Sequence, residues 1–347
     1  MNMKIVIASL HFGAGHTAHL EAYMKLAAHC GYESALYLNK RYLELFEDTD
    51  FRLLLDEDEL KAFKPDIVWI YNTGTENFKL IRTAKAMGCK IAYVLHEPDM
   101  GIKDLLKEGS YIPKQIAGTF VNRCICRYSD KVILSSERAI SNCGKHMKMA
   151  YRKSAFFPLI FPDRYIEGVD RKYFSLIGGY AAAHGSDEYL SFVKECCGRG
   201  NIFFQIATRS DISDKLEDSA FREMIKTGQL IVQQGRPLTE AEINMAYRRS
   251  VCTWNGYKRS TQSGVLANSF MQGTPVIATR VGSFEEYVVD GTNGVFIDGF
   301  GFDDILRAYE YVAERSKEMT EKCRETFLDK FCCLKQTQNF KNIVREL

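Results

Sequence analysis

Residues 255–264, Asn-Gly-Tyr-Lys-Arg-Ser-Thr-Gln-Ser-Gly, form a polar stretch between an expected strand and an expected helix. The strand is expected over 251–254, and the helix begins at about Gly264. The first N–H groups of a helix lack partners within it and carry partial positive charge, so this junction suits a diphosphate. An ordinary helix start, followed by a helix-to-strand turn at Gly273-Thr-Pro275, explains the same residues equally well. Both interpretations stay open.

A second glycine-containing stretch, His11-Phe-Gly13-Ala-Gly15-His16, directly follows the first expected strand, 4–9. Two glycines let the backbone approach a ligand closely, and Thr17 can cap the helix that follows. Because an imidazole titrates near neutral pH, His16 is a candidate general base for a reaction that inverts the reacting carbon. The alternative places His16 and His19 on the first turn of an exposed helix.

A third candidate, His96-Glu97-Pro98-Asp99, follows the expected strand 91–95. One histidine and two acids on a loop at the carboxyl end of a strand suit the recognition of hydroxyl groups. The alternative is a proline-containing turn with solvated acids. Glu285-Glu286 follows Val281-Gly282 and is either a capping or ribose-binding pair or a plain helix start.

Metal binding has little support in the sequence. Asp56-Glu-Asp58 has Asp-x-Asp spacing, but it lies in the amphipathic stretch 52–63, which indicates a solvated helix face. The 11 cysteines form no Cys-x-x-Cys pair, and Cys124 with Cys126 lacks zinc-ligand spacing. We therefore expect reduced thiols, no metal and no other cofactor.

The elements that position these loops alternate between strands and helices, which predicts parallel, doubly wound α/β sheets. A chain of 347 residues exceeds the usual size of one core, so two domains are expected. The prolines near 155–165 indicate a linker. We expect an N-terminal domain over 1–165 and a C-terminal domain over 166–325, followed by a helical stretch over 326–347.

Composition narrows the partners and the location. The net charge of +2 gives no support for nucleic-acid binding. No apolar run approaches the roughly 20 residues of a membrane span, and the N-terminus lacks a signal-peptide pattern, so a cytoplasmic location is expected. The basic stretch Lys145-His-Met-Lys148 with Tyr151-Arg-Lys153 either rests on anionic lipid at the inner face of the membrane or is an ordinary solvated face.

The C-terminal half resembles a known family. Gly273-Thr-Pro-Val-Ile-Ala-Thr-Arg-Val-Gly282, Glu285-Glu286 and Asp290-Gly-Thr-Asn-Gly-Val-Phe296 closely resemble the signature of the retaining glycosyltransferases with the GT-B fold. Ser260-Thr-Gln-Ser-Gly264 is similar to a bacterial subgroup that makes surface polysaccharides (group 1-like). The strong match covers about 251–297. The resemblance implies two Rossmann-like domains that face each other across a cleft, the N-terminal one for the acceptor and the C-terminal one for the nucleotide sugar. It also implies that the helix over 326–347 crosses back to the first domain.

The donor site departs from the family pattern. Two glutamates usually stand eight residues apart, and Ser260 and Asn268 occupy these positions. The positions of an arginine and a lysine that clamp the diphosphate hold Gly179 and His184. Neither supplies a permanent positive charge, so a relocated cation is expected, for which the candidates are Arg209, Lys258 and Arg259.

The resemblance implies a metal-independent glycosyltransferase of hexosyltransferase type that moves a sugar from a nucleoside diphosphate sugar to a glycan or lipid-linked acceptor, with retention and without a cofactor. Capsule, exopolysaccharide or O-antigen synthesis is the expected setting. The altered clamp keeps open an alternative, a catalytically silent subunit that binds sugar nucleotide or glycan. The expected catalytic residues are His96, His16, Arg209 and Arg259. The expected donor-binding residues are Gly13, Gly15, His184, Thr261, Gln262, Ser263, Gly264, Asn268 and Glu286.

Overall fold

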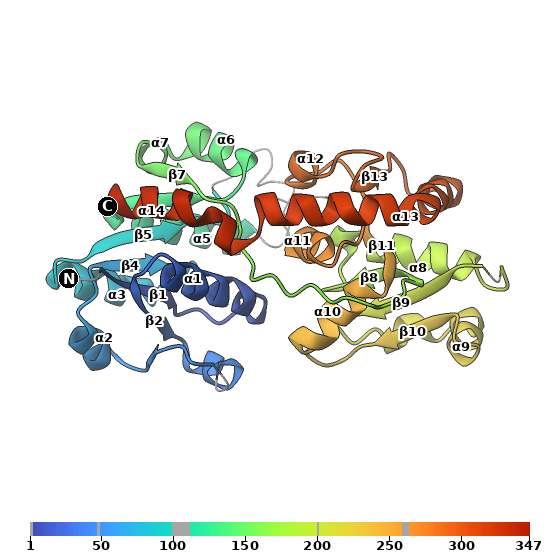
Figure 1. Cartoon of the computed structure of the whole chain (residues 1–347), viewed down its shortest axis with the longest axis horizontal. Coiled ribbons are helices and arrows are strands. Elements are labelled where there is room, and N and C mark those ends of the chain that lie inside the picture. The colour runs from blue at the N-terminus through green and yellow to red at the C-terminus, as the bar shows by residue number, and fades with distance from the viewer. Residues whose placement is uncertain (1–2, 47–48, 99–111, 200, 259–263) are drawn as a thin grey trace. The chain divides into compact units, whose positions relative to one another are not determined.

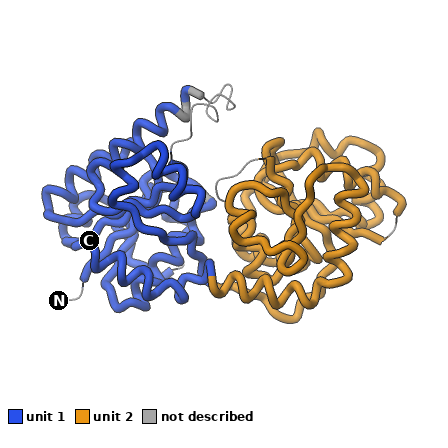
Figure 2. The backbone as a smooth tube through the Cα atoms, turned by 90° about the horizontal axis from the view of Figure 1, so that it is seen from above, with its two compact units in different colours: residues 1–162, 330–347 blue, residues 163–329 orange. Residues whose placement is uncertain are grey.

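The computed structural model describes residues 3–46, 49–98, 112–199, 201–258 and 264–347. The chain divides into two compact units (Figure 2). Unit 1 contains Met1–Pro162 together with Lys330–Leu347, and unit 2 contains Asp163–Asp329.

Unit 1 is a seven-stranded sheet in the order β3-β2-β1-β4-β5-β6-β7, and every pairing is parallel. The strands are β1 Lys4–Ser9, β2 Glu33–Leu38, β3 Leu53–Leu54, β4 Ile67–Ile70, β5 Lys90–Val94, β6 Lys131–Leu134 and β7 Ser154–Phe156. The helices are α1 Thr17–His29, α2 Glu57–Phe63, α3 Asn77–Ala86, α5 Ile112–Tyr128, α6 Glu137–His146, α7 Lys148–Tyr151 and α14 Thr337–Arg345.

Unit 2 is a six-stranded parallel sheet in the order β10-β9-β8-β11-β12-β13. The strands are β8 Tyr173–Ile177, β9 Phe203–Ala207, β10 Leu230–Gln233, β11 Ser250–Asn255, β12 Val276–Ala278 and β13 Gly294–Phe296. The helices are α8 Ser186–Glu195, α9 Ser219–Lys226, α10 Glu240–Arg248, α11 Gly264–Met271, α12 Phe284–Tyr287 and α13 Phe302–Lys330. The prediction of parallel, doubly wound sheets is confirmed.

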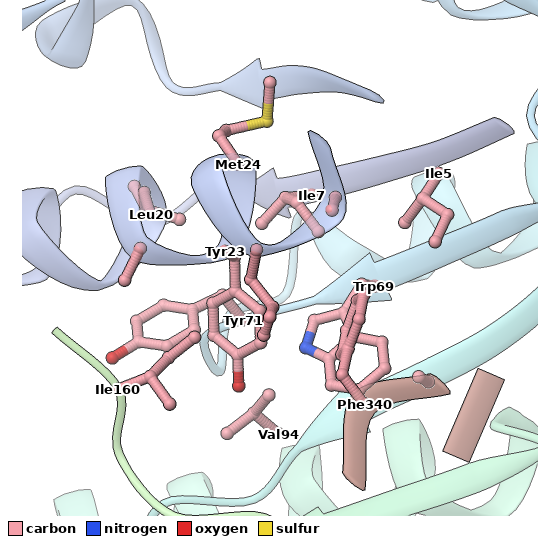
Figure 3. Packing of buried hydrophobic residues seen from close by; sticks show 14 of the residues in the cluster. Ile5, Ile7, Leu20, Tyr23, Met24, Trp69, Tyr71, Val94, Ile160 and Phe340 are labelled. Atoms are coloured by element: carbon pink, nitrogen blue, oxygen red, sulfur yellow. The ribbon is translucent and has the colours of Figure 1, made fainter. Parts of the chain in front are cut away.

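Aromatic packing ties the C-terminal helix α14 into the core of unit 1. The Phe340 ring lies 5.1 Å from Trp69 and 6.3 Å from Tyr23 of α1, measured between centroids (Figure 3). Phe157 and Ile160 are fully buried in the same core. The expected linker near 155–165 therefore begins as β7 and core packing, because its apolar residues find partners in the sheet.

Gly185, which precedes α8, combines a left-handed backbone conformation with a close backbone approach that leaves no room for a side chain. Its φ is +66°, and an added Cβ would lie 2.2 Å from the Gly256 carbonyl oxygen. Trp254 Nε1 donates to the Gly185 carbonyl at 2.9 Å, which holds the two loops together. The glycine thus allows the loop before α8 to touch the loop after β11.

Substitution of Gly185 is expected to lower the free energy of unfolding more than substitution of a glycine with open space around it. Gly185→Ala should lower the free energy of unfolding by about 3 kcal/mol, because left-handed strain and steric overlap add. Gly198→Ala is the matched control, since Gly198 has a φ of +77° but open space around it. It should cost about 1 kcal/mol in urea unfolding. Equal losses would contradict the close approach.

Candidate functional site

The carboxyl edge of β8 and β11 is the place in unit 2 where the strand order reverses, and open α/β sheets bind ligands at such points. The loop 178–185 follows β8, and the segment 255–258 ends β11 and continues beyond it. Tyr180 N donates to Ser210 Oγ at 3.3 Å, so the segment after β9 lies beside the first loop. Three chain segments therefore meet at this edge.

His184 is fixed at this edge by a ring stack and a hydrogen bond. Its imidazole lies parallel to the Tyr257 ring, with centroids 4.2 Å apart and planes at 11°. Its Nδ1 lies 2.8 Å from the Gly179 carbonyl oxygen, which can only accept, so Nδ1 carries the proton. Neutral His184 therefore offers Nε2 as an acceptor. It donates to a phosphate through Nε2 only as the imidazolium.

The structure distinguishes two of the three candidate cations, Lys258 and Arg209. The Lys258 ammonium forms an ion pair with Glu188 at 2.6 Å, so its charge is already balanced. Arg209 is exposed, directly after β9 and Thr208, and has no ion-pair or hydrogen-bond partner among the described residues. Arg259 lies outside the described residues. Of the two candidates that lie within the described ranges, Arg209 is thus the one whose charge stays available to an anion.

Helix α11 begins at Gly264, as expected from the sequence. Asn268, one turn further along, is half-buried, and its side chain makes no hydrogen bond within the described part of the chain. The expected donor residues Thr261, Gln262 and Ser263, together with Ser260, lie outside the described residues. Glu286 is half-buried in the first turn of α12.

Asn255, which ends β11, was not among the expected site residues. It is fully buried, and its Oδ1 has no hydrogen-bond partner within the described residues. A buried amide oxygen without a partner costs roughly 1–3 kcal/mol, so a water or ligand donor at this position would stabilise it. The sequence did contain a signal for Asn255, which is a polar residue at the end of a buried strand.

The loop after β1 is organised around a tyrosine that the sequence did not point to. Gly13 N donates to the Tyr42 hydroxyl at 2.8 Å, and this hydroxyl also lies 3.2 Å from Ser9 Oγ. A Cβ on Gly13 would lie 2.8 Å from the His16 ring. The glycine at position 13 therefore makes room for His16, while exposed Gly15 has open space around it.

Three histidines surround Tyr71 at the carboxyl edge of unit 1. Ring centroids lie 5.3 Å from Tyr71 for His16, 5.6 Å for His19 and 4.7 Å for His96. His16 and His96 stack at 6.2 Å. The sequence placed these residues on separate loops and helix turns, and the fold brings all three together.

Burial keeps these imidazoles neutral. It lowers the pKa of His96 to about 4 and that of His19 to about 3, and it lowers the pKa of His16, with His11 adding repulsion. The interpretation of His19 as part of an exposed helix turn is wrong, because α1 presses this side chain against Phe161. His16 itself belongs to a 3-10 turn before α1.

The tautomer of His96 follows from its contact with Tyr71. Its Nε2 lies 2.7 Å from the Tyr71 carbonyl oxygen, so Nε2 carries the proton and neutral Nδ1 accepts. His96 can therefore accept a hydrogen bond from a ligand hydroxyl. Glu97 is exposed, its backbone carbonyl accepts from Asn122 Nδ2 at 3.3 Å, and Asp99 lies outside the described residues.

The Asp-x-Asp pattern has a structural explanation. Asp56 Oδ1 accepts the N–H groups of Asp58 and Glu59 at 2.9 Å and so caps α2. In the described ranges, no three His, Cys, Asp or Glu side chains gather as metal ligands would. Nor does any helix in these ranges have the length and apolar character to cross a membrane.

Comparison with known proteins identifies the fold. No protein-family model and no curated protein matches the sequence. Anabaena HepE in complex with UDP superimposes with a TM-score of 0.73 at 11% identity, over 99% of this chain and 100% of HepE. Sucrose-phosphate synthase from Thermosynechococcus elongatus gives 0.69 at 12% identity, over 99% of both chains.

The lipopolysaccharide outer core galactosyltransferase WaaB gives a TM-score of 0.62 at 14% identity, over 99% of both chains. These proteins are GT-B glycosyltransferases, and the likeness extends over the whole chain. The predicted GT-B fold is confirmed.

Proposed function

We propose that this protein is a glycosyltransferase that moves a hexosyl group from a nucleoside diphosphate sugar to a glycan or lipid-linked acceptor. The observation that carries the proposal is the edge of unit 2 at β8 and β11, where His184, Arg209 and the start of α11 follow neighbouring strands. HepE, whose structures contain UDP and UDP-glucose, supports a nucleotide-sugar donor. Bacterial polysaccharide synthesis is the proposed setting.

Unit 2 binds the donor in this proposal. The N–H groups at the start of α11 and the Arg209 guanidinium bind the diphosphate, and the imidazolium form of His184 adds a donor. Asn268 and Glu286 hydrogen-bond ribose hydroxyls. The first three groups donate hydrogen bonds, which phosphate oxygens accept. The side chains of Asn268 and Glu286 can accept hydrogen bonds from ribose hydroxyls.

Unit 1 binds the acceptor in this proposal. His96 accepts a sugar hydroxyl through Nδ1, and the backbone at Gly15 lies open for close approach. The reaction breaks the bond between the anomeric carbon and the diphosphate and forms one to the acceptor oxygen. With retention, the acceptor proton passes to the departing diphosphate, so His16 is not the base. The proposal assigns no role to a metal.

Ligand-induced stabilisation tests donor binding. A nucleoside diphosphate should raise the melting temperature of the protein, because a ligand at 100 times its Kd stabilises by about 2.7 kcal/mol. The matching nucleoside is the control, since it lacks the diphosphate that Arg209 and α11 bind. The shift and the turnover should both persist in EDTA. If no nucleoside diphosphate raises the melting temperature, the proposal is overturned. A higher melting temperature without turnover would favour a silent binding subunit.

The stereochemistry of the product separates the two reaction courses. We expect the new glycosidic bond to keep the anomeric configuration of the donor, because Arg209 replaces the missing clamp charge. Proton NMR of the anomeric centre, compared with that of the donor, measures this. An inverted product, together with an inactive His16→Ala variant, would instead make His16 the base of a direct displacement.

A further inference from the structure

Charge is distributed very unevenly along the chain. Residues 112–156 contain nine Lys or Arg and two Asp or Glu, a net charge of +7, whereas the whole chain carries +2. The other 302 residues therefore carry −5. This basic segment spans α5, α6, α7 and β7 in unit 1. The near-neutral net charge of the whole chain is therefore compatible with one strongly basic segment.

Several of these cations are available to an external partner. Arg127, Lys145, Lys148 and Arg152 are all exposed, and none has a carboxylate partner in the part of the chain that the structure describes. Lys131 differs, because it pairs with Glu346 at 2.7 Å. An ordinary solvated face usually interleaves both signs of charge, whereas α5, α6 and α7 together contain one acid, Glu137, among their cations.

Large apolar side chains are exposed among the same cations. Six of the 13 large hydrophobic side chains exposed in the described residues belong to this segment. Phe120 and Met149 are each 65% exposed, the highest values among those 13. Single exposed apolar residues are normal, but a concentration of them marks an interaction surface. The exposed members are Ile116, Phe120, Tyr128, Met149, Tyr151 and Phe156.

Contacts join the helices that carry these residues. Arg123 Nη2 of α5 donates to the His146 carbonyl at the end of α6, at 3.4 Å. Helix α7 packs against both α5 and α6, and Figure 1 shows α6 and α7 side by side. Exposed Ile116, Phe120 and Arg123 stand four and three residues apart, so they share one face of α5.

We propose that the exposed face of α5, α6 and α7, the basic face, docks on an anionic lipid bilayer. Its cations attract acidic headgroups, while Phe120, Met149 and Tyr151 enter the region between headgroups and acyl chains. A nucleic acid would use the cations but offers no apolar phase for the aliphatic side chains of Ile116 and Met149. The apolar residues therefore favour the bilayer.

Vesicle cosedimentation of the full chain tests this docking. The protein should sediment with vesicles that contain phosphatidylglycerol, much less with phosphatidylcholine alone, and less again at high salt. Lys145→Gln with Lys148→Gln should lower the partition coefficient roughly thirtyfold, since each cation contributes about fivefold. Met149→Ser should lower it further without a change in charge.

A second double variant controls for the loss of two positive charges. Lys226 and Lys317 are exposed in unit 2 and have no ion pair with a described residue, so Lys226→Gln with Lys317→Gln removes the same charge elsewhere. This variant should keep vesicle binding. Absent binding to anionic vesicles, equal losses in the two double variants, or tighter binding to an RNA oligomer than to vesicles would each overturn the docking. Turnover is not needed, so this test is independent of the proposed function.

Discussion

Arg209→Ala is expected to lower kcat/KM by about 10²–10³, because it removes a preorganised positive charge from the departing diphosphate. Arg209 follows β9, beside the loop that carries His184, and forms no ion pair with any residue in the described ranges. The positive charge of Arg209 is therefore not neutralised by a described residue and can bind a ligand. Arg209→Lys should retain part of the rate, since a lysine keeps the charge but not the planar fork.

Lys258→Ala is the matched control for the loss of one cation near the same edge. Its ammonium is bound to Glu188, so kcat/KM should change little. Melting temperatures of all variants would separate folding from function. If Arg209→Ala keeps full activity while Arg259→Ala loses it, the relocated cation is Arg259 instead.

Acidification from pH 7 to pH 5 is expected to destabilise the protein by about 4 kcal/mol through His19 and His96. Both have a folded-state pKa below the unfolded value of 6.5, at about 3 and about 4. The unfolded chain therefore binds more protons below pH 6.5, and stability falls as pH falls through the window from 6.5 to these values. At pH 5 each group lowers the free energy of unfolding by about 2 kcal/mol, because the loss is about 1.36 kcal/mol per pH unit over the roughly 1.5 units below pH 6.5.

Urea unfolding at pH 7 and pH 5 measures this loss. The double variant His19→Gln with His96→Gln should lose much less stability between the two pH values, even if it starts lower at pH 7. His29→Gln, at the exposed end of α1, is the control and should keep the wild-type slope. An unchanged slope in the double variant would contradict burial of the two neutral imidazoles.

The sequence alone determined the alternation of strands and helices and the positions of the polar loops. Long apolar runs such as β1 and β4 are recognisable because burial on both faces of a parallel sheet requires continuous apolar residues. Short edge strands cannot be recognised in this way. β3 has two residues and β13 three, too few for any periodicity to develop.

The tertiary structure decided which polar residues meet and which charges are balanced. His16, His19 and His96 surround Tyr71 because parallel strands end at one edge of the sheet. Tyr42 reaches the Gly13 backbone from a turn 29 residues away. Such meetings depend on the packing of distant segments, which local sequence patterns do not encode.

The same distinction applies to the donor site. The sequence identified a helix start at Gly264 and three replacement cations, because these follow from residue type and spacing. Only the fold showed that Lys258 is bound to Glu188 while Arg209 is not engaged by the described residues. Lys258 and Glu188 are 70 positions apart, and they form an ion pair because the segments after β8 and β11 meet at one sheet edge. Whether a cation is available to bind a ligand therefore depends on the tertiary structure.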